Sequence, residues 1–135
     1  MSAQPESPAL SVARAHVQAW SQKDWDAARK MLAADVRVVA MTAAPYPPPT
    51  DLAGADEYMK GLVAFADPIV PGSVRELSGT GDERNALLTL DLIVAGGPFR
   101  DGAQAPCARL YLVEDGKIKA EQVVFYVGQG ASQAD

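Results

Sequence analysis

The stretch from Cys107 to Val127, CARLYLVEDGKIKAEQVVFYV, contains the pattern that decides the fold. Asp115-Gly116 lies between two runs rich in apolar and β-branched residues, and this dipeptide is typical of a two-residue hairpin turn. Counting outward from the turn pairs Glu114 with Lys117, and the pairing of every later residue follows from that pair. We therefore predict an antiparallel hairpin near the end of the chain.

One face of this predicted hairpin is apolar along most of its length but contains an acid. The regular count places Leu110 opposite Glu121, with Val123 and Phe125 continuing the same row. A carboxylate in such surroundings loses hydration, which predicts a pKa raised from about 4.3 towards neutrality and suits acid or base chemistry. Glu121 is therefore our first catalytic candidate. A structural role, in a hydrogen bond to a helix or at a wet pocket mouth, is the alternative.

The other hairpin face is too mixed for a core and too aromatic for plain solvent exposure. It carries Arg109, Tyr111, Gln122 and Tyr126 in the regular count. Interfaces between proteins favour Tyr and Arg, so this pattern predicts a homodimer formed through the outer face of the sheet. An ordinary amphipathic outer face is the alternative.

Apolar residues are spaced as in helices in most of the first half of the chain and alternate as in strands in the second half. Ser7-Pro8 and Asp24 suit the starts of two helices, and a third extends from Ala55 to before Pro68. The strands expected from period-two alternation are Val36 to Met41, Val74 to Ser78, Ala86 to Val94, Pro106 to Val113 and Lys117 to Val127, and Thr42 to Thr50 is expected to be a loop.

The order α-α-β-α-β-β-β-β predicts an α+β fold in which three helices cover one face of a curved antiparallel sheet. We expect one domain, residues 8–128, between a loose lead, 1–7, and a flexible tail, 129–135.

Composition excludes several classes of protein. No apolar run approaches the roughly 20 residues of a membrane span, and a net charge of -5 with 12 scattered Lys and Arg predicts no binding to nucleic acid. With Cys107 the only cysteine and His16 the only histidine, neither an internal disulfide nor a Cys/His zinc site is expected. We also expect no cofactor, no membrane partner and, from the absence of a signal-peptide pattern, a cytoplasmic location.

Two further residues are candidates for acid–base chemistry. His16 borders the inward stripe of the first helix and would suit proton transfer or an ion pair with Glu121, or it is a partly exposed histidine satisfied by backbone or water. Asp91 shares a strand row with Leu87 and Thr89, so it enters the pocket only if the purely apolar row beginning at Leu88 packs elsewhere. The candidate residues for the pocket lining are Trp20, Tyr58, Met59, Phe65, Leu110, Val123 and Phe125. The alternative is that the aromatic and methionine residues among them belong to an ordinary core.

Five short phrases occur in a characteristic order along the chain. They are VQAW (17–20), DWDAAR (24–29), MLAADV (31–36), GADEY (54–58) and VEDGKI (113–118). In this order they resemble the nuclear transport factor 2-like superfamily, especially its SnoaL-like members, from about His16 to Tyr126. The resemblance implies a cone-shaped fold whose wide end is a pocket for a lipophilic small molecule, often in a homodimer.

Members of this superfamily include polyketide cyclases, ketosteroid isomerases and epoxide hydrolases, besides scaffolds with no known chemistry. SnoaL-type cyclases are similar in placing a catalytic acid on the last strand, near the position of Glu121. The resemblance therefore implies either a cofactor-independent cyclase, isomerase or hydrolase that uses Glu121 with His16 or Asp91, or a non-catalytic ligand-binding or dimeric scaffold module.

Overall fold

The computed structural model describes residues 6–41, 50–94, 103–104 and 106–125, with the backbone alone at 40, 41, 50, 103 and 125. Three predicted features fall wholly or mostly outside these residues: the loop Thr42 to Thr50, the lead 1–7 and the tail 129–135. Tyr126 is also outside them.

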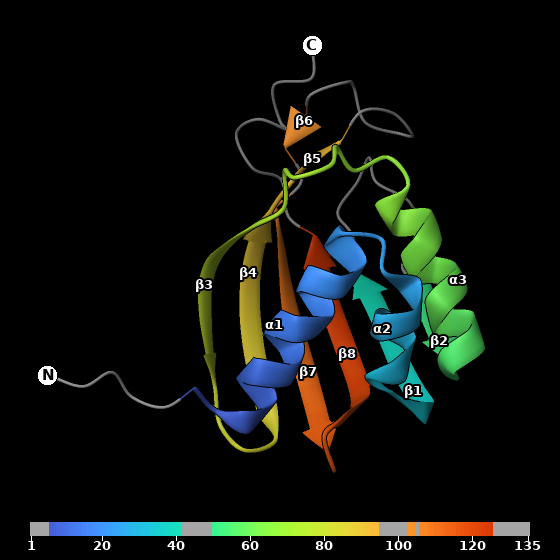
Figure 1. Cartoon of the computed structure of the whole chain (residues 1–135), viewed down its shortest axis with the longest axis vertical. Coiled ribbons are helices and arrows are strands. Elements are labelled where there is room, and N and C mark those ends of the chain that lie inside the picture. The colour runs from blue at the N-terminus through green and yellow to red at the C-terminus, as the bar shows by residue number, and fades with distance from the viewer. Residues whose placement is uncertain (1–5, 42–49, 95–102, 105, 126–135) are drawn as a thin grey trace, which may run out of the picture.

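The described residues form three helices and eight strands (Figure 1). The bounds are α1 Pro8–Ser21, α2 Trp25–Lys30, β1 Leu32–Met41, β2 Thr50–Ala53, α3 Ala55–Ala66, β3 Arg75–Gly81, β4 Asn85–Asp91, β5 Ile93–Val94, β6 Ala103–Gln104, β7 Cys107–Glu114 and β8 Lys117–Phe125. The predicted order of the main elements is confirmed. Strands β2 and β6 are additions to it, and the strand predicted from Ala86 to Val94 is divided into β4 and β5.

Local capping explains where the first two helices begin. The Ser7 hydroxyl accepts a hydrogen bond from the Leu10 amide at 3.0 Å, and Pro8 occupies the first helical turn, where no amide donor is needed. The Asp24 carboxylate accepts from the Ala27 amide at 3.3 Å at the start of α2. These two predicted helix starts are confirmed.

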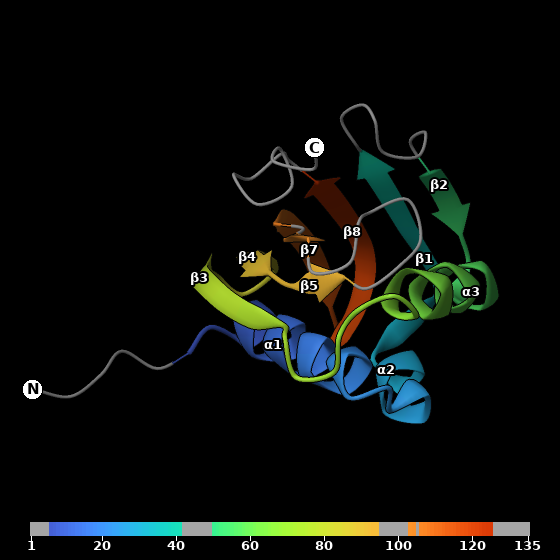
Figure 2. The same ribbon diagram turned by 90° about the horizontal axis from the view of Figure 1, so that it is seen from above.

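The main sheet has six strands in the order β2-β1-β8-β7-β4-β3. Strand β1 pairs with β8 in parallel, while the other neighbouring strands pair antiparallel, so the sheet is mixed. Figure 2 shows the sheet curving above α1, α2 and α3, which lie on the same side of it. The α+β fold with helices on one face is therefore confirmed, with one parallel pairing that the sequence did not predict.

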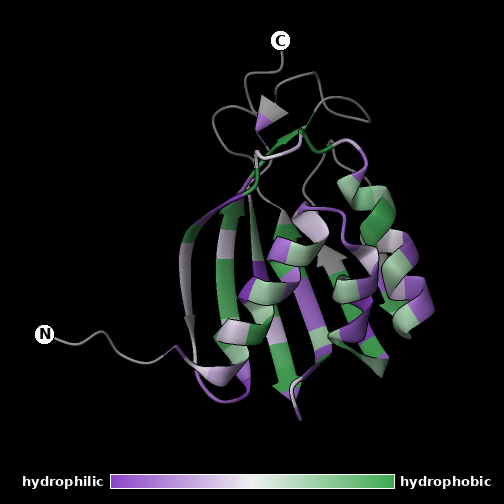
Figure 3. Ribbon diagram, viewed as in Figure 1, coloured by the Kyte–Doolittle hydropathy of each residue, from purple (hydrophilic) through white to green (hydrophobic). Residues whose placement is uncertain are grey.

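The core lies between this helical layer and the inner face of the sheet. Buried side chains of the helices, such as Ala13 and Leu62, belong to the same apolar cluster as Leu88 and Ile118 from the strands. Figure 3 shows hydrophilic stretches on β7 and β8 within this otherwise largely hydrophobic sheet. Arg109 on β7 and Glu121 on β8 are nevertheless buried, so these two charged side chains are the feature that needs explanation.

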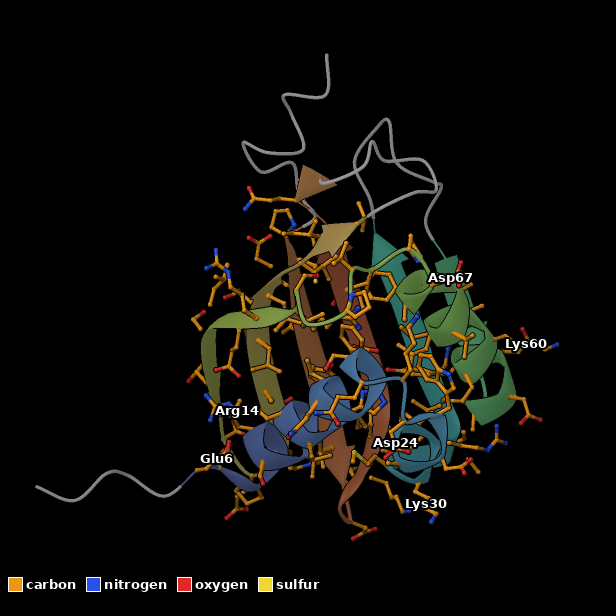
Figure 4. The ribbon with its side chains drawn as sticks, turned by 45° about the horizontal axis from the view of Figure 1, so that its top comes forward. Glu6, Arg14, Asp24, Lys30, Lys60 and Asp67 are labelled. Atoms are coloured by element: carbon orange, nitrogen blue, oxygen red, sulfur yellow. The ribbon has the colours of Figure 1, made fainter. Side chains whose placement is uncertain are left out.

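Exposed ion pairs connect α1 to the edge strand β3. Arg14 contacts Glu76 at 2.7 Å and Glu6 at 2.6 Å, and Figure 4 shows Arg14 and Glu6 close together. The carboxylates of Glu76 and Glu6 raise the already high pKa of Arg14 by hydrogen bonding. Because these side chains meet water, the pairs contribute little stability.

A β-bulge changes the register of the terminal hairpin. Glu114 pairs with Lys117 and Val113 with Ile118 as the regular count predicts, but Leu112 then pairs with Ala120. Lys119 is the additional residue, and every later pair is displaced by one position. The predicted pairing of Leu110 with Glu121 is therefore wrong, since Tyr111 is the residue opposite Glu121.

Because of this displacement, the row of β7 that was expected on the outer face shares the inner face with Glu121, and the row expected on the inner face lies outside. Tyr111 and Arg109 are buried on the inner face with Glu121, whereas Leu110 is 45% exposed on the outer face. The prediction that Arg109 and Tyr111 belong to an outer dimer surface is wrong. Gln122 is exposed as predicted, and the homodimer itself stays a prediction.

Candidate functional site

A buried ion pair lies at the centre of the inner sheet face. The Arg109 guanidinium on β7 donates from Nη1 to Oε2 of Glu121 on β8 at 2.7 Å. Both side chains are almost fully shielded from solvent. Removing two charges from water is costly, so an arrangement of this kind needs close pairing and additional hydrogen bonds.

Tyr58 supplies one of these additional hydrogen bonds from the helical layer. Its hydroxyl donates to Oε1 of Glu121, so each carboxylate oxygen has its own donor. Burial, followed by the negative charge of Glu121, raises the pKa of Tyr58 well above its ordinary value and keeps the phenol protonated. Helix α3 thus holds the carboxylate from above while β7 holds it from the side.

Two aromatic rings enclose the Arg109 guanidinium. Its central carbon lies 4.9 Å from the ring centroid of Trp20 on α1 and 4.9 Å from that of Phe65 on α3. The two rings meet edge to face, with centroids 5.6 Å apart. Cation–π attraction is stronger where water is excluded, so the rings offset part of the cost of burying this cation.

His16 lies on α1, between the two buried tyrosines. Its ring centroid is 5.8 Å from that of Tyr58 and 6.3 Å from that of Tyr111, both in edge-to-face orientation. Burial lowers the pKa of His16 to about 4, with the nearby charge of Glu121 opposing this shift and that of Arg109 adding to it. The imidazole is therefore neutral at pH 7. The prediction that His16 faces the interior is confirmed.

The protonation state of Glu121 differs from the one expected from sequence. Burial by itself raises the pKa of this carboxyl, but the charge of Arg109 and the hydrogen bonds from Tyr58 and Arg109 together lower it below its ordinary value. The predicted raised pKa is wrong because the regular count did not place a cation on the same face. Glu121 is therefore an ionised carboxylate at neutral pH.

Arg109 is equally fixed as a cation. Burial opposes its charge, but the charge of Glu121 more than compensates, and the pKa of Arg109 lies well above its ordinary value. The pair thus carries one positive and one negative charge with His16 neutral. The cluster has no net charge at pH 7.

Several buried polar atoms around this pair have no hydrogen-bond partner among the described residues. They are both ring nitrogens of His16, Nε1 of Trp20, Nε of Arg109 and the hydroxyl of Tyr111. Burial and, after it, the negative charge of Glu121 raise the pKa of Tyr111, so its phenol also stays protonated. Buried polar groups are almost always satisfied in folded proteins, so such a concentration needs an explanation.

These side chains form two layers along the sheet. Trp20 and Phe65 come from the last turns of α1 and α3, next to the beginning of β7, where Arg109 lies. Tyr58 and Tyr111 lie nearer the opposite ends of α3 and β7, and both flank His16. Figure 1 shows the last turns of α1 and α3 on the side of the molecule that carries β5 and β6. The Trp20–Arg109–Phe65 layer is therefore nearer that end than Glu121.

A small hollow borders this layer on the surface. It is lined by Trp20, Ser21, Lys23, Ala66, Ile69 and Pro71 and has a volume of about 10 Å³. This is room for about one water molecule. The larger lipophilic pocket expected from the sequence stays a prediction.

The second acid candidate, Asp91, lies apart from this cluster. Alternation along β4 places it in the row of Leu87 and Thr89, opposite the buried row of Leu88 and Leu90. Its carboxylate accepts from the Leu92 amide at 3.0 Å and from Gln104 Nε2 at 3.2 Å, and lies 3.5 Å from Arg75. Asp91 therefore joins β3, β4 and β6 at the end of the sheet and does not meet Glu121.

The remaining predicted lining residues divide between the two faces. Val123 is buried on the inner face, Met59 is buried in the core, and Leu110 is on the outer face. The side chain of Phe125 lies outside the described residues. Cys107 is buried beside Arg109, and burial raises the pKa of its thiol, so this cysteine is a packed side chain and not an activated thiolate.

Sequence reasoning missed Arg109 and Tyr111 as members of the site. One signal for them existed in β8, where Ile118 and Val123 are both strongly apolar but five positions apart. In a regular strand an odd spacing places two residues on opposite faces. Because both side chains are buried, an inserted residue between them is required, and the bulge at Lys119 supplies it.

The described residues contain neither a grouped metal-ligand set nor a membrane-spanning helix. Within the part of the chain that the structure describes, no three His, Cys, Asp or Glu side chains are grouped so as to hold a metal ion. Over the same residues, no helix is long and apolar enough to cross a membrane.

Solved structures share this architecture. A protein from Kribbella flavida is 28% identical, with 88% of this chain and 87% of that chain covered and a TM-score of 0.72. An epoxide hydrolase from M. tuberculosis, described as LEH-like, is 17% identical over 94% of this chain and 88% of its own, with a TM-score of 0.69. A Catenulispora acidiphila protein with a ketosteroid isomerase-like fold is 17% identical over 91% of both chains, with a TM-score of 0.68.

Sequence comparison identifies the family. No curated protein matches the sequence of this chain. The family model described as the SnoaL-like domain matches residues 13–121, which is most of the chain and includes every residue of the buried cluster. Together with the helix-covered mixed sheet, this match shows that the chain belongs to the SnoaL-like domain family, within the NTF2-like fold.

Proposed function

We propose that this protein binds a lipophilic small molecule at the inner face of its sheet and holds a polar group of that molecule against the Arg109–Glu121 cluster. The observation that carries the proposal is the set of buried polar atoms without a partner among the described residues. Each such atom costs free energy unless a hydrogen bond compensates for it. A ligand that supplies the missing partners would recover that cost on binding.

The surroundings of the cluster support a mainly apolar ligand body. Trp20, Phe65 and Val123 contribute apolar surface next to a small number of fixed polar groups, which is the usual composition of a small-molecule site. The ionised pair is held by β7, β8 and α3 together, so the polar groups are preorganised. A preorganised site loses little conformational entropy when a ligand binds.

The test is to map the binding of two small probes, acetophenone and ethylbenzene, by methyl and amide NMR spectra. We expect the methyl resonances of Val123 and Leu88, on the inner face, to shift on titration. The methyl resonances of Leu110 on β7 and Leu87 on β4, which belong to the outer face of the sheet, should not move. Shifts confined to the outer face, or saturation of neither face, would reject the proposal.

A matched pair of variants tests the location independently. Val123→Phe adds volume on the inner face and is expected to abolish probe binding, while Leu110→Phe adds the same ring on the outer face and should leave it unchanged. Circular dichroism establishes that both variants are folded. Should Val123→Phe not fold, displacement of the His16 ring resonances by the probes in the unaltered protein gives the same information.

Acid–base catalysis is the second candidate function. It is favoured by one observation, that the ionised carboxylate of Glu121 and the protonated phenol of Tyr58 meet in a site shielded from water. Such a pair has one group to accept a proton and one to donate it. Because an epoxide hydrolase shares the fold, we choose styrene oxide as the probe substrate. Hydrolysis above background that Glu121→Gln removes, with acetophenone binding retained, would support catalysis; equal hydrolysis by both proteins would reject it.

A further inference from the structure

We infer that the indole N–H of Trp20 and the Nε–H of Arg109 form the receiving site for the polar group, and that this group is a neutral oxygen acceptor, such as a carbonyl, and not a carboxylate. This inference rests on the proposed binding function and names the chemical class of ligand. In this arrangement the polar group of the ligand contacts Trp20 and Arg109, and not Glu121, the acid that the sequence analysis identified.

The two donors belong to the same layer. The guanidinium carbon of Arg109 lies over the Trp20 ring, 4.9 Å from the ring centroid, so the two side chains stack in a cation–π arrangement. Nη1 of Arg109 is used by Glu121, while its Nε and the Nε1 of Trp20 have no partner among the described residues. Both side chains are buried. Both unused groups are N–H donors and neither can accept a hydrogen bond, so their complement is an acceptor atom.

The charges of the cluster determine which acceptor fits. Glu121 already neutralises Arg109, and His16 is neutral at pH 7. A ligand carboxylate would bring a second negative charge to a buried site that has no unpaired cation for it, and burial of an unpaired charge is strongly unfavourable. A neutral carbonyl oxygen accepts the same hydrogen bonds without that cost.

One member of this layer, Trp20, lines the surface hollow, and Glu121 does not. Trp20 lines the surface hollow between the end of α1 and the segment after α3, although its own side chain is buried. His16 and Tyr111 lie further along the sheet and do not line that hollow. A ligand that approaches from this side meets the Trp20–Arg109–Phe65 layer first, and Glu121 then acts as a positioning residue that fixes Arg109.

The experiment compares three probes of similar size by NMR titration of the whole protein: acetophenone, ethylbenzene and benzoate. Acetophenone and ethylbenzene differ at one carbon, which is a carbonyl in the first and a methylene in the second. We expect acetophenone to bind about tenfold more tightly than ethylbenzene, since satisfying a buried donor has an effect of this order. We expect benzoate to bind more weakly than acetophenone.

The indole resonance of Trp20 gives a direct readout of the hydrogen bond. Acetophenone should move the Trp20 indole proton downfield, and ethylbenzene should not. Trp25, half-buried on α2, is the internal control, and Trp25→Phe assigns the two indole signals. Trp20→Phe keeps an aromatic ring but lacks the donor, so it should reduce the preference for acetophenone severalfold while leaving the affinity for ethylbenzene nearly unchanged.

Each alternative result has a definite meaning. Equal affinity for acetophenone and ethylbenzene would leave binding intact and overturn the inference alone. Tighter binding of benzoate, or an unmoved Trp20 indole signal, would also overturn it, the latter because the donor would then already be satisfied within the chain. Failure of all three probes to bind would overturn the inference and the proposed function together.

Discussion

The same chemical contact occurs on both faces of the sheet. On the inner face Arg109 meets Glu121 at 2.7 Å, and on β1 and β2 Arg37 meets Asp51 at 2.7 Å. The inner side chains are 3% and 1% exposed, whereas the outer ones are 59% and 61% exposed. Distance does not distinguish the two pairs, so their different importance comes from burial.

Burial changes what each residue needs from its partner. Water can solvate Arg37 or Asp51 if the other is removed, so the exposed pair is replaceable. Glu121 has no such substitute, and its surroundings therefore provide Arg109, Tyr58 and the rings that enclose the guanidinium. A buried pair is costly to assemble and is weak evidence for stability, but breaking it by removing one partner is severe.

Arg109→Met should have the largest effect on stability. It leaves the Glu121 carboxylate buried without its cation, and we expect a loss of about 3–5 kcal/mol in the free energy of unfolding at neutral pH. Urea denaturation followed by circular dichroism measures this loss.

The double variant Arg109→Met, Glu121→Leu is the matched control for that result. It contains no unpaired charge, so it should recover a large part of the lost stability. A double variant that is less stable than Arg109→Met would contradict the view that an uncompensated charge, and not lost packing, causes the damage.

His16 makes the inner face sensitive to acid. Because the folded pKa of about 4 lies below the unfolded value of 6.5, the unfolded chain binds more protons between these values. The free energy of unfolding is therefore highest above pH 6.5 and decreases as the pH falls towards 4. The expected loss is about 2 kcal/mol between about pH 7 and pH 5.

His16→Gln removes this titration, and its unfolding free energy should depend much less on pH in that window. The groups that face His16, namely Glu121, Arg109, Tyr58 and Tyr111, keep their charge states there, since the pKa of Glu121 is lowered and those of the others are raised. Parallel pH profiles for the two proteins would show that His16 is not the group responsible.

Arg37→Met should have the smallest effect. Both partners of this pair meet solvent, and water replaces the lost contact with Asp51. The urea midpoint is expected to remain within experimental error of the unaltered protein. A loss comparable to that of Arg109→Met would remove the distinction between the two faces.

Local signals in the sequence were sufficient for most of the fold. Ser7 and Asp24 cap the helices they were expected to cap, and the change from helical to strand periodicity predicted the order of the main elements. These features depend on neighbours within a few residues, so they are readable without coordinates. The parallel pairing of β1 with β8 joins distant parts of the chain and has no comparable local signal.

The sequence by itself also determined that Glu121 and His16 are interior candidates, because each borders an apolar stripe of its own element. Which residues of β7 meet Glu121 was decided only by the tertiary structure. Packing places Ile118 and Glu121 on the same inner face although they are three positions apart, and a strand achieves this only with a bulge. That single inserted residue brings Arg109 and Tyr111 inside and gives Glu121 its ionised state.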